Sequence, residues 1–238
     1  IYILFNELEK SYDFCVHLPS SNGYLLDLES GKLQNLQTKN GVLNISLATG
    51  ETAVVLLTDE TYNAENKKEL KNRFDITNGF MFRKENELVC NENGFDNINH
   101  SDKAVPVTLG DWSCLIGGAY SGSGVYETKF SLPDEKTGTK GIINLGDVRF
   151  TASVYLNDHF LGTSLMPPYT LKIPSGLLRK ENELKIIVTN TSANWYLHTD
   201  YFDKWSAYEL SPYFQQELDY AKESVSGGLY GPVTLYTE

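Results

Sequence analysis

The stretch from Gly141 to Asn190 constrains the fold most strongly, because it consists of short β-branched and aromatic runs bounded by Gly, Pro, Asn or Asp. Within it, Ala152, Val154 and Leu156 alternate with polar or mixed side chains, so one face of that segment is apolar. This alternation is typical of a strand in a β-sandwich. We predict strands over residues 142–145, 151–156, 169–173 and 183–189.

Turn residues follow the first two of these strands. Gly146-Asp147 comes after the first strand, and Asn157-Asp158 comes after the second. Gly and Asn tolerate positive φ, and Asp can hydrogen-bond to its own backbone. Both pairs therefore predict turns between neighbouring strands.

The first 58 residues form a similar series of short strands separated by Pro, Gly, Asn and Ser clusters. A spacing of about ten residues favours a small antiparallel sandwich, or half of one. The predicted strands are residues 1–5, 12–18, 23–28, 42–47 and 52–57.

The segment 59–72 is rich in Glu and Lys and poor in apolar residues, so we interpret it as a solvated linker. In the segment after it, residues 74–76 and 80–82 look like strand pieces, whereas residues 92–103 are polar and predict a loop. A chain of 238 residues is long enough for two domains. The predicted division is a small β-sandwich over 1–58, a linker over 59–72 and a larger domain over 73–238.

Several motifs in the second half occur in an order that carries a resemblance. They are Leu-Gly-Asp-Trp at 109–112, Ala-Ser-Val-Tyr-Leu-Asn-Asp-His-Phe-Leu-Gly at 152–162, Glu-Asn-Glu-Leu-Lys-Ile-Ile-Val-Thr-Asn at 181–190 and Ser-Gly-Gly-Leu-Tyr-Gly-Pro-Val at 226–233. Together they resemble the galactose-binding-like jelly roll that accompanies the catalytic barrel in family 2 glycoside hydrolases and in the related family 106 rhamnosidase group. Asp158 stands where that jelly roll usually has Gly in a turn.

The N-terminal segment carries a weaker resemblance to the same group. Phe5-Asn6-Glu7 and the run Leu-Ala-Thr-Gly-Glu-Thr-Ala-Val-Val-Leu at 47–56 resemble pieces of the β-rich segment that follows the catalytic barrel in family 106 enzymes. The expected fold is therefore all-β, a small antiparallel β-sandwich followed by a galactose-binding-like jelly-roll β-sandwich. The resemblance also implies a bacterial-type protein that is secreted or periplasmic.

Charge and composition exclude several classes of partner and site. The formal net charge of -11 disfavours nucleic acid and anionic membranes as partners. Cys15, Cys90 and Cys114 are too few and too scattered for a disulfide framework or a zinc site. The chain begins at Ile1 inside a predicted strand, so we expect a fragment or processed product whose targeting signal, if any, lies upstream.

The segment 190–224 is the least β-like part of the larger domain and is an insertion between two predicted strands. Long insertions at the end of a sandwich are often functional. Trp and Tyr planes accept the apolar C–H faces of sugar rings, while nearby Asp and His side chains can hydrogen-bond to the hydroxyls. The candidate carbohydrate-binding residues are Trp195, Tyr196, His198, Asp200, Tyr201 and Trp205. The alternative is that these aromatic residues pack against a catalytic barrel.

No catalytic residues are expected in this chain. Glycoside hydrolysis needs two carboxylates that face one sugar bond. The families that this chain resembles place these carboxylates on a barrel of repeating βα units, and this sequence contains no such repeat. His198 and Asp200 could join a serine in a triad, but no Gly-x-Ser-x-Gly motif occurs. A metal at His198, Asp200 and Asp203, or a structural Ca²⁺ elsewhere, stays an open alternative, and no other cofactor is expected.

The sequence thus favours a non-catalytic accessory region of a larger glycoside hydrolase, acting as a carbohydrate-binding or scaffold module on an upstream catalytic domain. Two alternatives remain open. The first is a self-standing adhesion or protein-interaction β-sandwich, and the second is a small hydrolase centred on His198.

Overall fold

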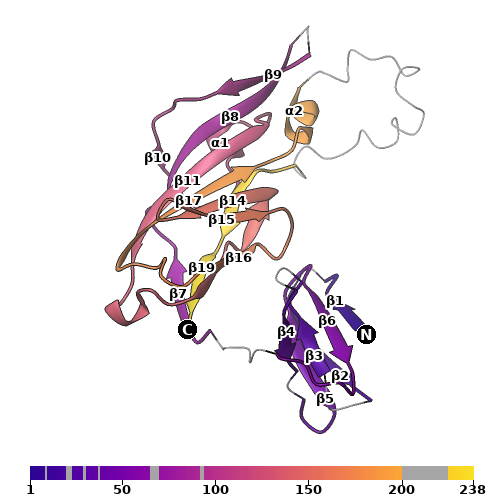
Figure 1. Ribbon diagram of the computed structural model, residues 1–238. Helices are drawn as coiled ribbons and strands as arrows, with labels where there is room; N and C mark the ends of the chain where they lie inside the picture. The colour runs from indigo at the N-terminus through magenta and orange to yellow at the C-terminus, as the bar shows by residue number, and fades with distance from the viewer. Residues whose placement is uncertain are drawn as a thin grey trace, which may run out of the picture. The chain divides into compact units, whose positions relative to one another are not determined.

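The computed structural model describes residues 1–8, 10–19, 23–28, 31–36, 38–64, 70–91, 94–199 and 225–238. These residues form two compact units, a smaller one that takes in Ile1–Lys71 and a larger one that takes in Asn72–Leu165 and Tyr169–Thr237 (Figure 1). Both units consist almost wholly of antiparallel strands, which confirms the predicted all-β fold class. The predicted domain limits at 58 and 73 stay predictions.

The smaller unit has a four-stranded sheet and a separate strand pair. The sheet order is β1 (Tyr2–Phe5), β6 (Thr52–Leu57), β3 (Gly23–Leu26) and β4 (Leu33–Asn35), and β2 (Tyr12–His17) pairs with β5 (Val42–Leu47). All strands predicted in this part are present, with ends shifted by two residues at most. Strand β4 was not predicted, because three residues are too short to show an alternation.

A buried asparagine organises one corner of the smaller unit. Asn6 is 1% exposed, and its Nδ2 lies 2.9 Å from the carbonyl oxygen of Leu47 and 3.1 Å from that of Ala48. The Glu51 carboxylate accepts a hydrogen bond of 2.8 Å from the Ala48 backbone N–H. The two N-terminal motifs picked out in the sequence therefore meet here and hold β1 beside the turn that precedes β6.

The larger unit contains a seven-stranded antiparallel sheet. Its order is β10 (Val105–Pro106), β8 (Met81–Asn91), β11 (Gly122–Ser131), β17 (Glu181–Thr189), β14 (Thr151–Leu156) and β15 (His159–Ser164), and β9 (Gly94–Asn99) also pairs with β8. The inward side chains of β14 and β17 alternate strictly with outward ones. This alternation is the one predicted from the sequence.

A second sheet covers the inner face of the first. It has the order β16 (Thr170–Ile173), β12 (Gly141–Asn144), β19 (Val233–Thr237) and β7 (Asn72–Ile76). The strands β13 (Asp147–Arg149) and β18 (Gly228–Gly231) form a separate short pair. Three short helical segments complete the described part: α1 (Ser113–Ile116), η1 (Asp134–Lys136) and α2 (Ala193–His198). The arrangement is a β-sandwich, as expected.

The core of the sandwich is formed by aliphatic side chains from both sheets and by an aromatic group at one side. Trp112 and Tyr126 are buried with their ring planes 7° apart, and Phe82 packs against both. The Tyr126 hydroxyl accepts a hydrogen bond from the backbone N–H of Leu229 at 3.2 Å. The Leu-Gly-Asp-Trp motif and the closing Ser-Gly-Gly-Leu motif are thus in contact through the core.

One loop prediction was wrong. Within the segment 92–103 that was interpreted as a loop, residues 94–99 form strand β9, which pairs with β8 along its whole length. Five of its six residues are exposed, because β9 lies at the margin of the sheet and has no core to face. A polar strand of this kind carries no hydrophobic alternation by which it could be recognised.

The turn prediction at Asn157-Asp158 is confirmed. Asn157 has φ 51° and Asp158 has φ 64°, which is the left-handed backbone that the turn between β14 and β15 requires. The replacement of the usual Gly by Asp158 therefore leaves the hairpin intact.

Candidate functional site

Three aromatic side chains meet at one end of the larger unit, where α2 lies beside the hairpin of β8 and β9 (Figure 1). Trp195 and Tyr196 on α2 have ring centroids 5.3 Å apart, and the Phe95 ring on β9 lies 6.4 Å from Trp195 and 6.1 Å from Tyr196. All three pairs are edge-to-face. Phe95 is 49% exposed, so the cluster presents an apolar ring to solvent. We refer to Phe95, Trp195 and Tyr196 as the aromatic end.

Helix α2 is anchored on the sandwich by hydrogen bonds that begin where β17 stops. The Asn190 Nδ2 donates to the carbonyl oxygen of Tyr120 at 2.7 Å, and its Oδ1 accepts from the Gly122 backbone N–H at 2.8 Å. The Ser121 Oγ then accepts a hydrogen bond of 2.9 Å from the backbone N–H of Trp195. The side chains of Ser121 and Asn190 therefore fix the position of α2, which carries Trp195 and Tyr196.

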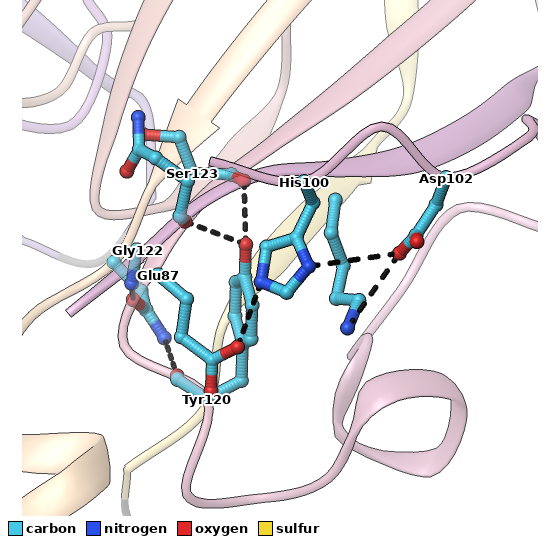
Figure 2. A network of polar contacts seen from close by, with 9 residues as sticks. Glu87, His100, Asp102, Tyr120, Gly122 and Ser123 are labelled. Atoms are coloured by element: carbon cyan, nitrogen blue, oxygen red, sulfur yellow. Dashed lines mark hydrogen bonds and ion pairs between the residues drawn. The ribbon is translucent and has the colours of Figure 1, made fainter. Parts of the chain in front are cut away.

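A polar network lies beneath this end, between β8 and the residues that follow β9 (Figure 2). The Nε2 of His100 lies 2.8 Å from the Glu87 carboxylate, and its Nδ1 lies 4.0 Å from the carboxylate of Asp102. Lys84 pairs with Asp102 at 3.5 Å. The His100 side chain is only 16% exposed, and its contact with Glu87 links the residue that follows β9 to β8.

Tyr120 links the network to strand β11. Its hydroxyl lies 2.7 Å from the carbonyl oxygen of Asn86 and 2.8 Å from that of Ser123, and it can donate to either (Figure 2). Burial raises the pKa of Tyr120 above its ordinary value, and the negative charge of Glu87 raises it further. The hydroxyl therefore stays protonated at neutral pH and serves as a structural hydrogen-bond donor.

The structure brings together some of the residues predicted as carbohydrate-binding and does not describe the others. Trp195 and Tyr196 share the aromatic end, and the Nδ1 of His198 lies 2.9 Å from the carbonyl oxygen of Asn194 within α2. Asp200, Tyr201 and Trp205 lie outside the described residues, as does Asp203. Whether the predicted set forms one site stays a prediction.

Phe95 was missed by the sequence reasoning. It lies in the polar segment that was interpreted as a loop, and a single aromatic residue in such a run is a weak signal. Its position opposite Trp195 follows from the pairing of β9 with β8, which joins Phe95 to Cys90 in register. Only this long-range pairing identifies it as part of the cluster.

The described ranges contain neither a metal-binding cluster nor a membrane-spanning helix. No group of three or more His, Cys, Asp or Glu side chains there is arranged to hold a metal ion. Cys15 and Cys114 are exposed free thiols. No helix among the described residues is long and apolar enough to cross a membrane.

The geometry can be compared with known proteins. Residues 95–194 match the family model of the β-galactosidase second all-beta domain. Over its whole length the chain also superposes on a rhamnosidase from Novosphingobium sp. PP1Y, with a TM-score of 0.64, 19% identity and coverage of 22% of that chain. The predicted resemblance to accessory β-domains of glycoside hydrolases is confirmed.

A more distant similarity connects the chain with glucuronidases. The structure of Bifidobacterium dentium β-glucuronidase matches 70% of this chain and 30% of its own length, with a TM-score of 0.46 and 19% identity. No curated protein matches the chain. In both solved structures the chain spans less than a third of the protein that it resembles.

The accessory-domain match covers part of the sandwich and ends beside Trp195; strands β7, β8, β18 and β19 lie outside it. It begins at Phe95 on β9 and ends at Asn194, one residue before Trp195. It therefore includes the Asn190 side chain and the core strands β11, β14 and β17, which hold α2 in place. The match accounts for part of the scaffold, whereas a role for Trp195 and Tyr196 has to be argued from their geometry.

Proposed function

We propose that this chain is the non-catalytic accessory region of a larger, secreted or periplasmic glycoside hydrolase, and that the aromatic end of its larger unit binds carbohydrate. The accessory β-domain similarity gives the context. The observation that carries the binding role is the cluster of Phe95, Trp195 and Tyr196, which holds a half-exposed aromatic ring at a fixed place on a rigid sandwich.

Two features of the cluster suit a sugar ligand. An exposed aromatic ring offers a face on which the C–H groups of a pyranose can pack. The anchoring of α2 through Ser121 and Asn190 means that little side-chain or backbone freedom has to be lost on binding, and this preorganisation favours affinity.

A scaffold role competes with sugar binding at this place. The same aromatic side chains could pack on a catalytic domain of the full-length protein, because exposed apolar patches often mark interfaces. Glycan binding by the isolated chain distinguishes the two roles. A sugar-binding site requires such affinity, whereas a contact with a catalytic domain does not.

The test is affinity electrophoresis of the isolated chain in gels that contain soluble polysaccharides, run beside Phe95→Ala and Trp195→Ala variants. Sugar binding at the aromatic end predicts retardation of the wild type and a loss of retardation in both variants. A well-folded wild type that binds no glycan would instead favour the scaffold role.

The non-catalytic part of the proposal has its own test. We expect the isolated chain to release no nitrophenol above blank from a panel of nitrophenyl glycosides, because we predict that its carboxylates form no catalytic pair across a cleft. Robust turnover would overturn this part, and a His198→Ala variant would then show whether the activity depends on the histidine of α2.

A further inference from the structure

A groove of about 490 Å³ crosses the outer face of the seven-stranded sheet. Its lining includes Glu127 on β11, Lys185 on β17 and Tyr155 on β14. These residues alternate along their strands with the core residues Tyr126, Ile186 and Val154, so they point away from the core. The groove therefore lies on the outer side of the sheet and involves neither α2 nor Phe95.

The strand register places one row of side chains across this face. Met81 pairs with Glu127, Glu127 with Lys185, Lys185 with Tyr155, and Tyr155 with Phe160. The Tyr155 and Phe160 rings lie 5.0 Å apart, and the Lys185 Nζ lies 4.3 Å from the centre of the Tyr155 ring. The row thus passes from a polar centre to an aromatic pair at the β15 end.

Phe160 is the accessible part of that pair. It is 51% exposed, whereas the ring of Tyr155 is covered on one side by Lys185. Tyr155 therefore supports Phe160, and the Phe160 ring is free to receive an apolar ligand surface.

The charged groups of the groove differ in whether they already have partners. Lys129 forms an ion pair with Glu183, and Lys185 rests on the Tyr155 ring. By contrast, the carboxylates of Glu127 and Asp158 make no hydrogen bond or ion pair with any residue that the structure describes. Both lysines therefore already have partners, whereas the two carboxylates are available as hydrogen-bond acceptors. This arrangement favours a ligand with hydroxyl donors and disfavours an anionic ligand.

The position of Asp158 is fixed by its turn. The Asn157 backbone N–H donates to the carbonyl oxygen of Glu183 at 2.8 Å, and the Asn157 Oδ1 accepts from the Glu183 backbone N–H at 2.9 Å. The Asn157 Nδ2 also donates to the carbonyl oxygen of Leu177 at 2.9 Å. The residue that replaces Gly in this turn thus carries a carboxylate on a rigid support at the groove.

We propose that this groove is a second carbohydrate-binding site, which takes a neutral glycan chain. One sugar ring packs on Phe160, which lies next to the lining residue Tyr155, and neighbouring hydroxyls donate to Asp158 and Glu127. A protein partner suits the groove less well, because charged side chains occupy its centre and such residues are depleted from the centres of protein interfaces. The site stands on different residues from the aromatic end, so it does not depend on the function proposed above.

The experiment uses the full chain in affinity electrophoresis with neutral polysaccharides (β-1,4-galactan, galactomannan and xyloglucan) and with anionic polygalacturonate. The variants are Phe160→Ala, Asp158→Asn and Phe5→Ala. Phe160 and Phe5 are matched, since both are phenylalanines that are about half exposed, and Phe5 belongs to neither proposed binding site. Circular dichroism and thermal unfolding establish that each variant is folded.

The expected result is retardation of the wild type and of Phe5→Ala by at least one neutral polysaccharide. Phe160→Ala should lose at least tenfold in affinity, Asp158→Asn several-fold, and polygalacturonate should not bind. Binding that is unaffected by Phe160→Ala, or absent from the wild type, would overturn the proposal of a binding site in the groove. Binding that is unaffected by Phe160→Ala would leave the aromatic end as the binding site, and a folded wild type that binds nothing would point to a protein partner for this face.

Discussion

Asn6 shows how a single residue can hold a small unit together. Its side chain is almost completely buried and reaches three backbone carbonyl oxygens, those of Lys10, Leu47 and Ala48, while its Oδ1 accepts from the Leu8 backbone N–H. Buried backbone groups that lose their partners cost far more than an average hydrogen bond contributes. The stability of this corner therefore depends on one amide.

The first prediction concerns this amide. Asn6→Ala should reduce the free energy of unfolding of the smaller unit by about 3 kcal/mol, because it leaves buried carbonyl groups unpaired. Asn44→Ala is the matched control, since Asn44 lies exposed on β5 of the same unit. Urea unfolding followed by far-UV circular dichroism measures both changes, and equal effects of the two variants would contradict the role given to Asn6.

The second prediction concerns the hydroxyl of Tyr120. Tyr120→Phe keeps the buried ring but removes the donor to Asn86 and Ser123, and should cost about 1–2 kcal/mol of stability. Tyr155→Phe, on the outer face of the same sheet, should change stability much less. The two variants are compared by urea unfolding at pH 7.

The same hydroxyl predicts a pH dependence. Because the pKa of Tyr120 is raised in the folded chain, the unfolded chain loses this proton first, and the contribution of Tyr120 to stability falls as pH rises above its ordinary pKa of 10.0. The stability difference between wild type and Tyr120→Phe should therefore be constant up to about pH 9 and shrink in more alkaline solution. A difference that grows with pH would contradict this assignment.

At the scale of the element, the hairpin of β14 and β15 depends on a backbone conformation that few residues adopt. Asn157 and Asp158 both have positive φ, and Asn157 is tied to β17 and to Leu177 by its backbone and side chain. Asn and Asp tolerate the left-handed region better than other residues with a side chain. The hairpin therefore accepts Asp in place of Gly at position 158.

The third prediction follows from this turn. Asp158→Gly should change the free energy of unfolding by no more than about 1 kcal/mol, whereas Asp158→Val should cost about 1–3 kcal/mol, because a β-branched residue is strained at positive φ. Both variants remove the carboxylate, so their difference reports the backbone alone. Equal stabilities in urea unfolding would show that the turn rearranges.

At the scale of the whole molecule, the two units have separate cores. The larger core cluster draws its buried residues from positions 76–235, whereas the core cluster of the smaller unit consists of Leu18, Leu43 and Val55. A unit with so small a core cluster has little stability of its own, since small domains bury a smaller fraction of their surface. The larger unit, by contrast, has a complete sandwich core.

The fourth prediction tests this division. A chain of residues 72–238 should fold alone and unfold cooperatively, with near-UV circular dichroism from the buried Trp112 preserved. Residues 1–71 alone should be marginally stable. Loss of the cooperative transition in the 72–238 chain would show that its core needs the smaller unit.

The sequence by itself determined the all-β class, most core strands and the turn at Asn157-Asp158. These features are local, because the alternation of apolar residues and the tolerance of positive φ are read within one strand or one turn. The motif order also indicated the accessory-domain resemblance, which the match over residues 95–194 confirms.

Only the tertiary structure decided which distant residues meet. Strand β9 has no apolar face, so its pairing with β8, and with it the place of Phe95 beside Trp195, follows from hydrogen bonds across the sheet rather than from an alternation. The row from Met81 to Tyr155 arises in the same way, from the register of four strands far apart in the chain, and the hairpin turn at Asn157-Asp158 then adds Phe160. Register between distant strands is set by packing on a shared core, and no local turn fixes it.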